Sequence, residues 1–492
     1  MSEVLERLDK LSPERQALLH KLLRQKAAQA REPDAIRPRG SDVPAPLSFA
    51  QERLWFLDRL EPGSATYNIP TALRLAGALD ARALERALGE IVRRHEALRT
   101  VFTEVDGSPV QVIAPFGGFE LPVEDLSALG EADREATVRR RAGEEAARPF
   151  DLSAGPLFRA ALLRLGEEDH VLLLSMHHIV SDGWSMGVLQ RELNALYAAY
   201  REGRESPLPE LAVQYADYAA WQREQLEGEG LERQIAYWRE HLAGAPELLE
   251  MPTDHPRPPV QTFRGASVPV ELSPELLEQL QALARSEGAT LYMVLLGAFQ
   301  VLLGKYSGSD DVVVGSPVAG RTRKEAEELI GFFVNTLVLR TELGGDPSYR
   351  EVLGRVREAT LGAYAHQEVP FEKLVAELQP ERSLSLSPFF QVMFTLQNAG
   401  GGGDALAGLK VSGVAPEMEI AKFDLSLTLA ATDQGLNGEL NYSTDLFERG
   451  TIERMLGHLA RVLEQVAARP EARLSKLDLL SAEERGLVVD AW

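Results

Sequence analysis

Apolar residues recur at helical spacing in some segments and at strand spacing in others, which predicts a body that mixes helices with strands. Helical periodicity covers residues 79–102 and 187–201, and residues 158–177 have the apolar content of a buried strand pair. A last helix is predicted over residues 448–467. Further strand-like segments lie at residues 266–272, 312–314, 336–340, 389–396 and 423–429.

The beginning of the chain differs from this body. Residues 1–30 read as two short amphipathic helices, in which Leu5, Leu8 and Leu11 recur at helical spacing. Such helices could pack on their own domain or dock on another protein, and the sequence leaves both interpretations open. Residues 31–46 are rich in Pro, Arg, Asp and Gly, which predicts a linker.

A polar break divides the body in two. The Glu-Gly-Glu-Gly run at residues 227–230 interrupts an aromatic-rich helical segment, and a chain of 492 residues is too long for a single core. We therefore expect one lobe over residues 47–226 and a second lobe over residues 227–478. Residues 479–492 begin a capped helix and are expected to lead into a further domain.

Composition restricts the class of function without identifying one. The chain is 45% hydrophobic and 26% charged, and it has neither a signal peptide nor an apolar run near the roughly 20 residues of a membrane-spanning helix. Cysteine is absent, which excludes disulfides and thiolate nucleophiles and fits a cytoplasmic location. A net charge of −22 repels phosphate backbones, so nucleic-acid binding is not expected.

One segment combines the residue types that catalysis needs. An apolar run ends in His177-His178-Ile179-Val180-Ser181-Asp182-Gly183. Adjacent residues on a strand point to opposite faces, so one histidine can face a channel while the other faces the interior. Gly183 leaves room for a ligand in the turn that follows. The two histidines could also be satisfied core groups, whereas a metal site is disfavoured because no third histidine stands at ligand spacing and cysteine is absent.

The segment from His177 to Gly183 resembles the His-His-x-x-x-Asp-Gly motif of nonribosomal peptide synthetase condensation domains and matches it at every fixed position. Other blocks of the chain are similar to the remaining motifs of that family, in their usual order: residues 48–57, 94–102, 215–222, 330–336, 366–371 and 382–394. The likeness spans roughly residues 47–480. Because the blocks occur together and in order, coincidence is a poor explanation of the likeness.

The resemblance implies an α+β fold of two lobes, each like a chloramphenicol acetyltransferase protomer, in a V-shaped pseudo-dimer with the active site in a tunnel between them. It also implies an acyltransferase that forms an amide bond. The amine of an aminoacyl thioester on a downstream peptidyl carrier protein would attack an acyl or peptidyl thioester on an upstream one. Both substrates would hang on 4'-phosphopantetheine arms, so neither a bound cofactor nor a metal is expected. Residues 479–492 resemble the linker to an adenylation domain.

The resemblance assigns roles within the motif. His178 matches the catalytic histidine, which either takes a proton from the attacking amine or positions that amine. His177 is expected to support the strand end. Asp182 matches a structural residue that pairs with an arginine of the second block, and we favour Arg99 over Arg94 as this partner.

Four further residues are expected to support the site. Gly183 would keep the acceptor channel open. Asn335 would reach the site from the second lobe, although a strand-end amide that binds backbone is an alternative. Trp184 and Ser185 continue the motif, and Ser185 is not expected to be a nucleophile because the chain has no Gly-x-Ser-x-Gly elbow.

These residues favour a condensation domain that takes an L-configured donor. The His177-His178 pair argues against a heterocyclisation domain, and the continuation through Ser185 with the opening block at residues 50–55 disfavours an epimerisation domain. A starter domain that takes a fatty acyl donor stays open. Two other classes are weaker alternatives: a non-catalytic module that recruits carrier proteins or tailoring enzymes, which the intact motif disfavours, and a free-standing acyltransferase that uses acyl-coenzyme A, which the linker-like ends disfavour.

Overall fold

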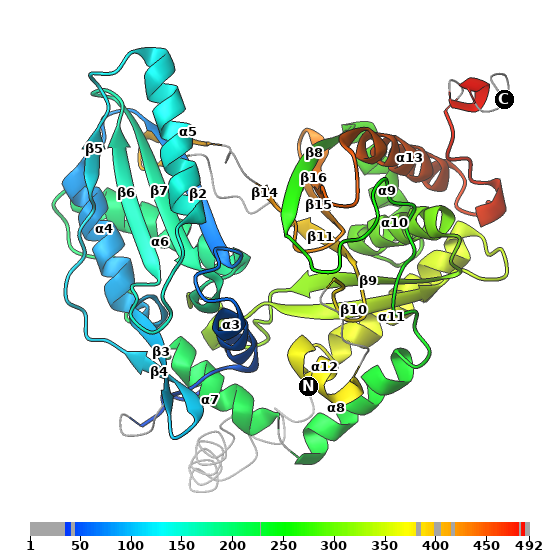
Figure 1. Cartoon of the computed structure of the whole chain (residues 1–492), viewed down its shortest axis with the longest axis horizontal. Coiled ribbons are helices and arrows are strands. Elements are labelled where there is room, and N and C mark those ends of the chain that lie inside the picture. Colours follow the sequence, from blue (N-terminus) through cyan, green and yellow to red (C-terminus); the bar gives the residue numbers. More distant parts are fainter. Residues whose placement is uncertain are drawn as a thin grey trace, which may run out of the picture.

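The computed structural model describes residues 35–40, 45–226, 228–379, 385–397, 405–414, 419–481 and 484–487. The helices predicted within residues 1–30 lie outside these ranges. The described chain forms two lobes that open as a V, one on each side of Figure 1. The expectation of an α+β fold with two lobes is confirmed.

The first lobe is built on one sheet, whose strands are β2 (Asn68–Ala76), β5 (Val123–Asp125), β6 (Phe158–Arg164), β7 (Asp169–His177), β12 (Ala405–Leu406) and β13 (Leu409–Gly413). Their order is β12-β13-β2-β7-β6-β5. The helices of this lobe are α3 (Phe49–Leu60), α4 (Ala81–Arg94), α5 (Glu131–Ala147), α6 (Gly183–Arg201) and α7 (Tyr215–Gln225). A small second sheet contains β1 (Ala45–Pro46), β3 (Thr100–Val105) and β4 (Ser108–Ile113).

Strand β7 is buried on both faces. Val171 and Leu173 pack with residues of α5, whereas Leu172 and Leu174 belong to the larger cluster that contains the buried sides of α4 and α6. The strand therefore reads as a continuous apolar run, and it carries the backbone to His177 between two packed layers.

The second lobe has a seven-stranded sheet of order β10-β9-β11-β15-β16-β8-β14. Its strands are β8 (Arg264–Leu272), β9 (Asp311–Val318), β10 (Asn335–Glu342), β11 (Val392–Gln397), β14 (Glu419–Ile420), β15 (Leu425–Thr432) and β16 (Gly435–Ser443). Its helices are α8 (Gly228–His241), α9 (Pro274–Ser286), α10 (Leu291–Ser307), α11 (Tyr349–Ala365), α12 (Phe371–Leu378) and α13 (Arg449–Ala468). The core of this lobe begins at Leu226, close to the predicted break.

Two segments of the second half of the chain cross into the first lobe, so a simple division at residue 227 is wrong for them. Strand β13 pairs antiparallel with β2 and thereby extends the sheet of the first lobe. The segment between β9 and β10, residues 319–334, places Ile330 and Phe333 in the core of the first lobe. We call this segment the crossover segment. A sequence pattern shows that such residues are apolar but not which core they enter.

The predicted linker also packs on the first lobe in its described part. Ile36 is buried, the backbone N–H of Arg39 donates to the Asp217 carboxylate at 2.9 Å, and β1 pairs with β4. Residues 35–40 and 45–46 are therefore part of the folded body, and their Pro-rich composition reflects an irregular backbone instead of a free linker.

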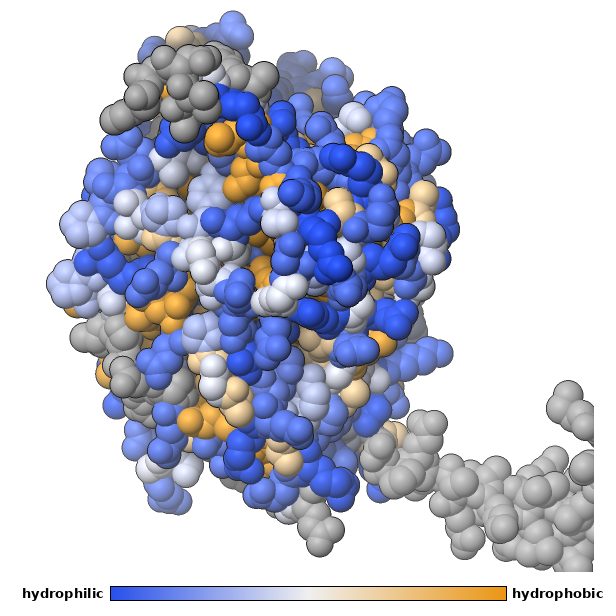
Figure 2. All heavy atoms as spheres, turned by 90° about the vertical axis from the view of Figure 1, so that its right-hand side faces the viewer, coloured by the Kyte–Doolittle hydropathy of each residue, from blue (hydrophilic) through white to orange (hydrophobic). Residues whose placement is uncertain are grey.

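The outer face of the second lobe is mostly hydrophilic, with hydrophobic residues in small separate groups (Figure 2). Among the described helices, no single one is long and apolar enough to cross a membrane. Helices α9 and α10 together have sufficient length, but they meet at an angle of 104° and their apolar side chains lie in the core.

We predict that Gly331→Ala loosens the crossover segment. A Cβ at residue 331 would lie 2.0 Å from Cδ2 of the buried Tyr215, so the substitution should lower the free energy of unfolding by about 1–3 kcal/mol. The matched control is Gly354→Ala in α11, where a Cβ meets nothing within 4 Å and the helix should gain about 0.5–1 kcal/mol. Urea unfolding checks both. Equal stability of the two variants would contradict the close contact.

Candidate active site

The histidine pair lies at the end of β7, where the strand turns into a short 3₁₀ helix, His178–Val180. His177 is buried, and its Nδ1 accepts the backbone N–H of Ile179 at 3.1 Å. The backbone N–H of His178 donates to the carbonyl oxygen of Tyr67 at 2.8 Å. These two hydrogen bonds fix the end of the strand. The His178 ring lies at the junction of the lobes, edge-on to the Phe332 ring of the crossover segment, with the two ring centroids 4.9 Å apart.

The His178 ring is neutral and has a defined tautomer. Its Nδ1 lies 2.9 Å from the carbonyl oxygen of Ser181, which can only accept, so Nδ1 carries the proton and Nε2 presents a lone pair. Burial, and then the positive charge of Lys422, lower the His178 pKa to about 3. The ring therefore stays uncharged at neutral pH.

His177 has the contacts of a residue that holds the turn. Its ring lies between those of Tyr67 and Phe150, with centroids 6.4 Å and 6.0 Å away. Burial, and then the neighbouring His178 and Lys422, lower its pKa to about 3 as well. This environment agrees with the expectation that His177 supports the strand end.

Asp182 is the N-cap of α6 and links that helix to the crossover segment. Its Oδ1 accepts the backbone N–H of Ser185 at 2.8 Å, and its Oδ2 accepts the backbone N–H of Phe333 at 2.9 Å. Oδ1 also lies 3.2 Å from Nη2 of Arg321. The side chains of Asp182 and Arg321 are 2% and 1% exposed, so the ion pair is fully buried.

The expected pairing of Asp182 with Arg99 is wrong. Arg99 donates to the carbonyl oxygen of Ala114 at 2.5 Å, and Arg94 pairs with Glu192 at 3.0 Å on the other side of α6. Both arginines lie in or after α4, which packs against α6, and each is engaged by a partner other than Asp182. The partner comes instead from the second half of the chain.

Arg321 is the residue that the sequence failed to identify. Besides Asp182 it donates to Ser185 Oγ at 2.8 Å and to the carbonyl oxygens of Leu329 and Ala326, and its guanidinium lies 4.0 Å from the centre of the Phe333 ring. Burial lowers its pKa, and Asp182 opposes that effect. In the sequence it is an arginine between two predicted strands, at residues 312–314 and 336–340, and nothing there points to a partner 139 residues away.

Ser185, Trp184 and Gly183 occupy the first turn of α6. Ser185 Oγ accepts the backbone N–H of Gly331 at 3.1 Å and lies within 2.8 Å of both Asp182 Oδ1 and the Gly331 carbonyl oxygen, so it is a structural hydroxyl. Trp184 is 44% exposed and donates through Nε1 to the Glu327 carbonyl oxygen. Gly183 is exposed, and a Cβ there would meet nothing within 4 Å.

Asn335 lies at the start of β10 with all its amide groups engaged. Its Nδ2 donates to the carbonyl oxygens of Gln367 and Val369, and its Oδ1 accepts backbone N–H groups of Thr336 and Phe371. Asn335 thus binds backbone with its amide, and it also lines the pocket between the lobes from the second lobe. It holds the loop before α12 against the lobe junction.

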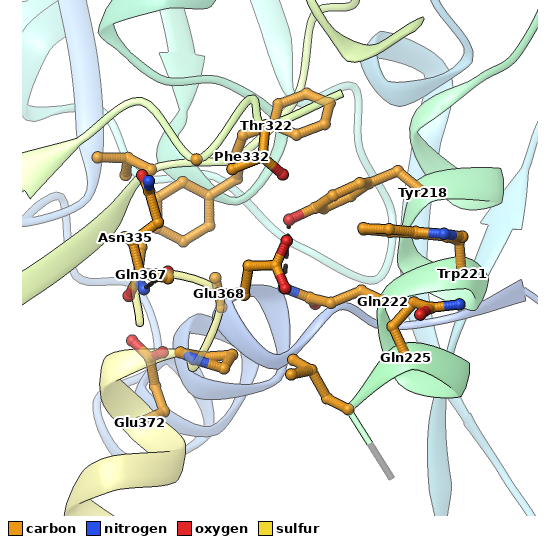
Figure 3. Close-up of a pocket in the computed structure, with 16 residues that line it drawn as sticks. Tyr218, Trp221, Gln222, Gln225, Thr322, Phe332, Asn335, Gln367, Glu368 and Glu372 are labelled. Atoms are coloured by element: carbon orange, nitrogen blue, oxygen red, sulfur yellow. Dashed lines mark hydrogen bonds between the residues drawn. The ribbon is translucent and has the colours of Figure 1, made fainter. Parts of the chain in front are cut away.

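A pocket opens between the lobes beside this site. Figure 3 shows Tyr218, Trp221 and Gln222 of α7 on one side, with Glu368 and Glu372 of the second lobe opposite them. Phe332 also lines the pocket, so the ring that contacts His178 forms part of its wall. The pocket therefore reaches the immediate surroundings of the histidine.

The comparison with protein families decides the classification. The family model described as "Condensation domain" matches residues 43–488. The chain belongs to the condensation domain family. Members of this family form amide bonds in nonribosomal peptide synthetases, and the fold is that of chloramphenicol acetyltransferase-like condensation domains.

Individual relatives are similar over most of this condensation domain. It is 52% identical over 453 residues to part of a linear gramicidin synthase of Brevibacillus parabrevis, and the match covers 92% of this chain but only 6% of that protein. The X-domain from teicoplanin biosynthesis superposes with a TM-score of 0.82 at 34% identity, over 91% of this chain and all of that one. The first condensation domain of the CDA synthetase superposes with a TM-score of 0.72 at 25% identity, over 90% of this chain and all of that one.

We predict that Asp182 and Arg321 are energetically coupled. Asp182→Ala or Arg321→Ala leaves an unpaired buried charge, so each should cost roughly 3–5 kcal/mol of folding stability. The double variant should lose less than the sum, as measured by denaturant unfolding in a double-mutant cycle.

Arg99→Ala is the control for this cycle, because Arg99 has no contact with the Asp182 carboxylate. Its effect should add to that of Asp182→Ala within about 0.5 kcal/mol. If the Asp182 and Arg321 effects add to the same extent, the two groups are not coupled and the assignment is wrong.

Proposed function

We propose that this condensation domain joins a donor acyl or peptidyl thioester on an upstream peptidyl carrier protein to the amine of an aminoacyl thioester on a downstream one. Both substrates would be carried on 4'-phosphopantetheine arms. The observation that carries the proposal is the neutral His178 ring, whose Nε2 lone pair makes no hydrogen bond within the described residues and lies at the junction of the lobes. Such an acceptor suits an attacking amine.

His178 is proposed to orient the amine more than to hold its proton. Effective general bases have a pKa near the working pH, whereas burial lowers the His178 pKa to about 3. A lone pair at Nε2 can still accept a hydrogen bond from the amine and direct its attack. Holding both thioesters in line can supply about 7–11 kcal/mol, which leaves orientation as the main task of the protein.

The pocket between the lobes is the proposed approach for one of the two arms. Gln222 and Glu368 supply polar groups along it, and Phe332 separates it from the His178 ring. Gly183 borders the site with open space over its Cα, which supports its proposed role in keeping a channel open.

The donor type and the larger assembly are also proposals. The motif favours an L-configured donor, with a fatty-acyl starter domain as the alternative. The chain spans only 6% and 9% of two related linear gramicidin synthase proteins, so we propose that it belongs to a longer protein with a neighbouring adenylation domain. A cytoplasmic location is proposed as well. One observation favours a recruitment module instead: a similar X-domain is known in complex with OxyB.

We predict that His178→Ala lowers the rate of amide formation by about 10²-fold, because the amine loses the group that orients it. His178→Gln should recover part of this loss, because an amide oxygen also accepts a hydrogen bond. Mass spectrometry of the acceptor carrier, after mixing donor-loaded and acceptor-loaded carriers with each variant, measures the product.

His255→Ala, an exposed position in the second lobe, is the matched control and should react as wild type does. Melting temperatures establish that each variant is folded. Absence of product with wild type across L-aminoacyl and fatty-acyl donors, together with binding of carriers, would favour the recruitment module.

We further predict that Gly183→Val blocks substrate without unfolding the domain. Its Cβ meets no protein atom within 4 Å, so the melting temperature should stay near that of wild type while KM for the acceptor-loaded carrier rises at least about 10-fold. The control is Gly457→Val in α13, which also has an open Cβ position. Unchanged kinetics in Gly183→Val would remove Gly183 from the channel.

A further inference from the structure

A lysine of the second lobe lies across the cleft from the histidine pair. Lys422 sits between β14 and β15, and its Nζ is 4.9 Å from the centre of the Tyr67 ring. Tyr67 belongs to the first lobe, and its carbonyl oxygen holds the backbone N–H of His178. Gln261 fixes the lysine backbone by donating to its carbonyl oxygen at 2.9 Å. The ammonium group is therefore held beside the residue that supports His178.

The charge of Lys422 faces the Tyr67 ring but has no anionic partner among the described residues. The side chain is partly buried, and its Nζ forms no ion pair or hydrogen bond with any residue in the ranges that the structure describes. Burial, and then the positive charge of Arg53, lower its pKa to about 8, so the group is still charged at pH 7. Because an unpaired buried cation opposes folding, the position of Lys422 is better explained by function than by stability.

The charged groups around Lys422 are paired or neutral at pH 7. Arg53 of α3 is paired with Glu372 of α12 at 3.0 Å, so these two largely cancel each other. The other titratable groups that face the lysine are Tyr67, whose pKa burial raises, and the two neutral histidines. Within the described residues, Lys422 is thus a cation of this wall that lacks an anionic partner at neutral pH.

We propose that Lys422 is a further catalytic residue of this condensation domain, whose ammonium stabilises the negative charge that develops on the carbonyl oxygen of the donor thioester. This inference rests on the proposed amide-forming function. A fixed cation in a site shielded from water stabilises a developing oxyanion more strongly than solvent does, because it needs no reorganisation.

The step balances without a further reactant. The amine nitrogen bonds to the thioester carbonyl carbon, and the carbonyl π electrons move to the oxygen, where Lys422 faces the charge. The nitrogen, oriented by His178, gives up one proton as the oxyanion reforms the carbonyl and the C–S bond breaks. The leaving thiolate takes that proton, so the products are the amide on the acceptor arm and a free thiol on the donor arm.

Three variants test the assignment with donor-loaded and acceptor-loaded carriers. Lys422→Met keeps the length of the side chain but removes its charge, and kcat should fall about 10²–10³-fold while KM for both carriers stays near wild type. Lys422→Arg keeps the charge and should remain within about 10-fold of wild type. Lys410→Met removes a lysine charge from an exposed position on β13 and should change nothing.

The dependence on pH separates a charge effect from a packing effect. Lys422 is charged below its pKa of about 8, so the ratio of wild-type to Lys422→Met rates should be largest at pH 7 and fall as the pH rises through 8. The ratio of Lys422→Arg to Lys422→Met should stay constant over the same range, because a guanidinium stays protonated. Taking ratios cancels the titration of the substrate amine, whose reference pKa is about 7.7–8.0.

Stability supplies a second readout. The pKa of Lys422 in the folded state is below the unfolded value of about 10.4. Below pH 8 the folded state therefore holds a charged lysine that is less favourable there than in the unfolded chain, and this lowers the free energy of unfolding. Lys422→Met removes that charge and should melt at or above the wild-type temperature. A folded Lys422→Met with wild-type kcat would overturn the proposal, as would Met and Arg variants that are equally slow at every pH. A wild type that forms no amide would instead refute the proposed function.

Discussion

The buried ion pair between Asp182 and Arg321 is the constraint on which the geometry of the site depends. Asp182 ends the turn that begins at His178 and starts α6, so its carboxylate fixes the backbone on the far side of the histidine. Arg321 brings the crossover segment onto that carboxylate, and this segment carries Phe332 to the edge of the His178 ring. One contact therefore sets both the turn and the wall that faces it.

The two lobes are joined by two segments of the second half of the chain that pack into the first lobe. Strand β13 completes the sheet of the first lobe, and the crossover segment contributes Ile330 and Phe333 to its core. The crossover segment thereby places Phe332 from the second half of the chain against the His178 ring, so the site is assembled from both halves of the chain.

The sequence predicted the two-lobed α+β fold and the importance of the histidine segment because both depend on local pattern. The apolar run that ends at His177 is continuous because β7 is buried on both faces, and Asp182 is a recognisable helix cap. The partner of Asp182 could not be predicted, since charge complementarity allows any arginine and only the path of the chain selects Arg321. The same limit applies to Asn335, whose position was expected but three of whose four backbone contacts are to a loop 32–36 residues away.

Burial lowers the pKa of both His178 and Lys422 but leaves them with different charges at neutral pH, and this difference argues for how the work is shared. It removes the proton from His178, which becomes a weak base and a good hydrogen-bond acceptor, and it leaves Lys422 charged at neutral pH, with a pKa of about 8. A lone pair and a nearby cation match the two ends of an attacking amine and a polarised carbonyl. Because each group acts in the charge state that it already holds at neutral pH, neither needs to exchange a proton with solvent during the step.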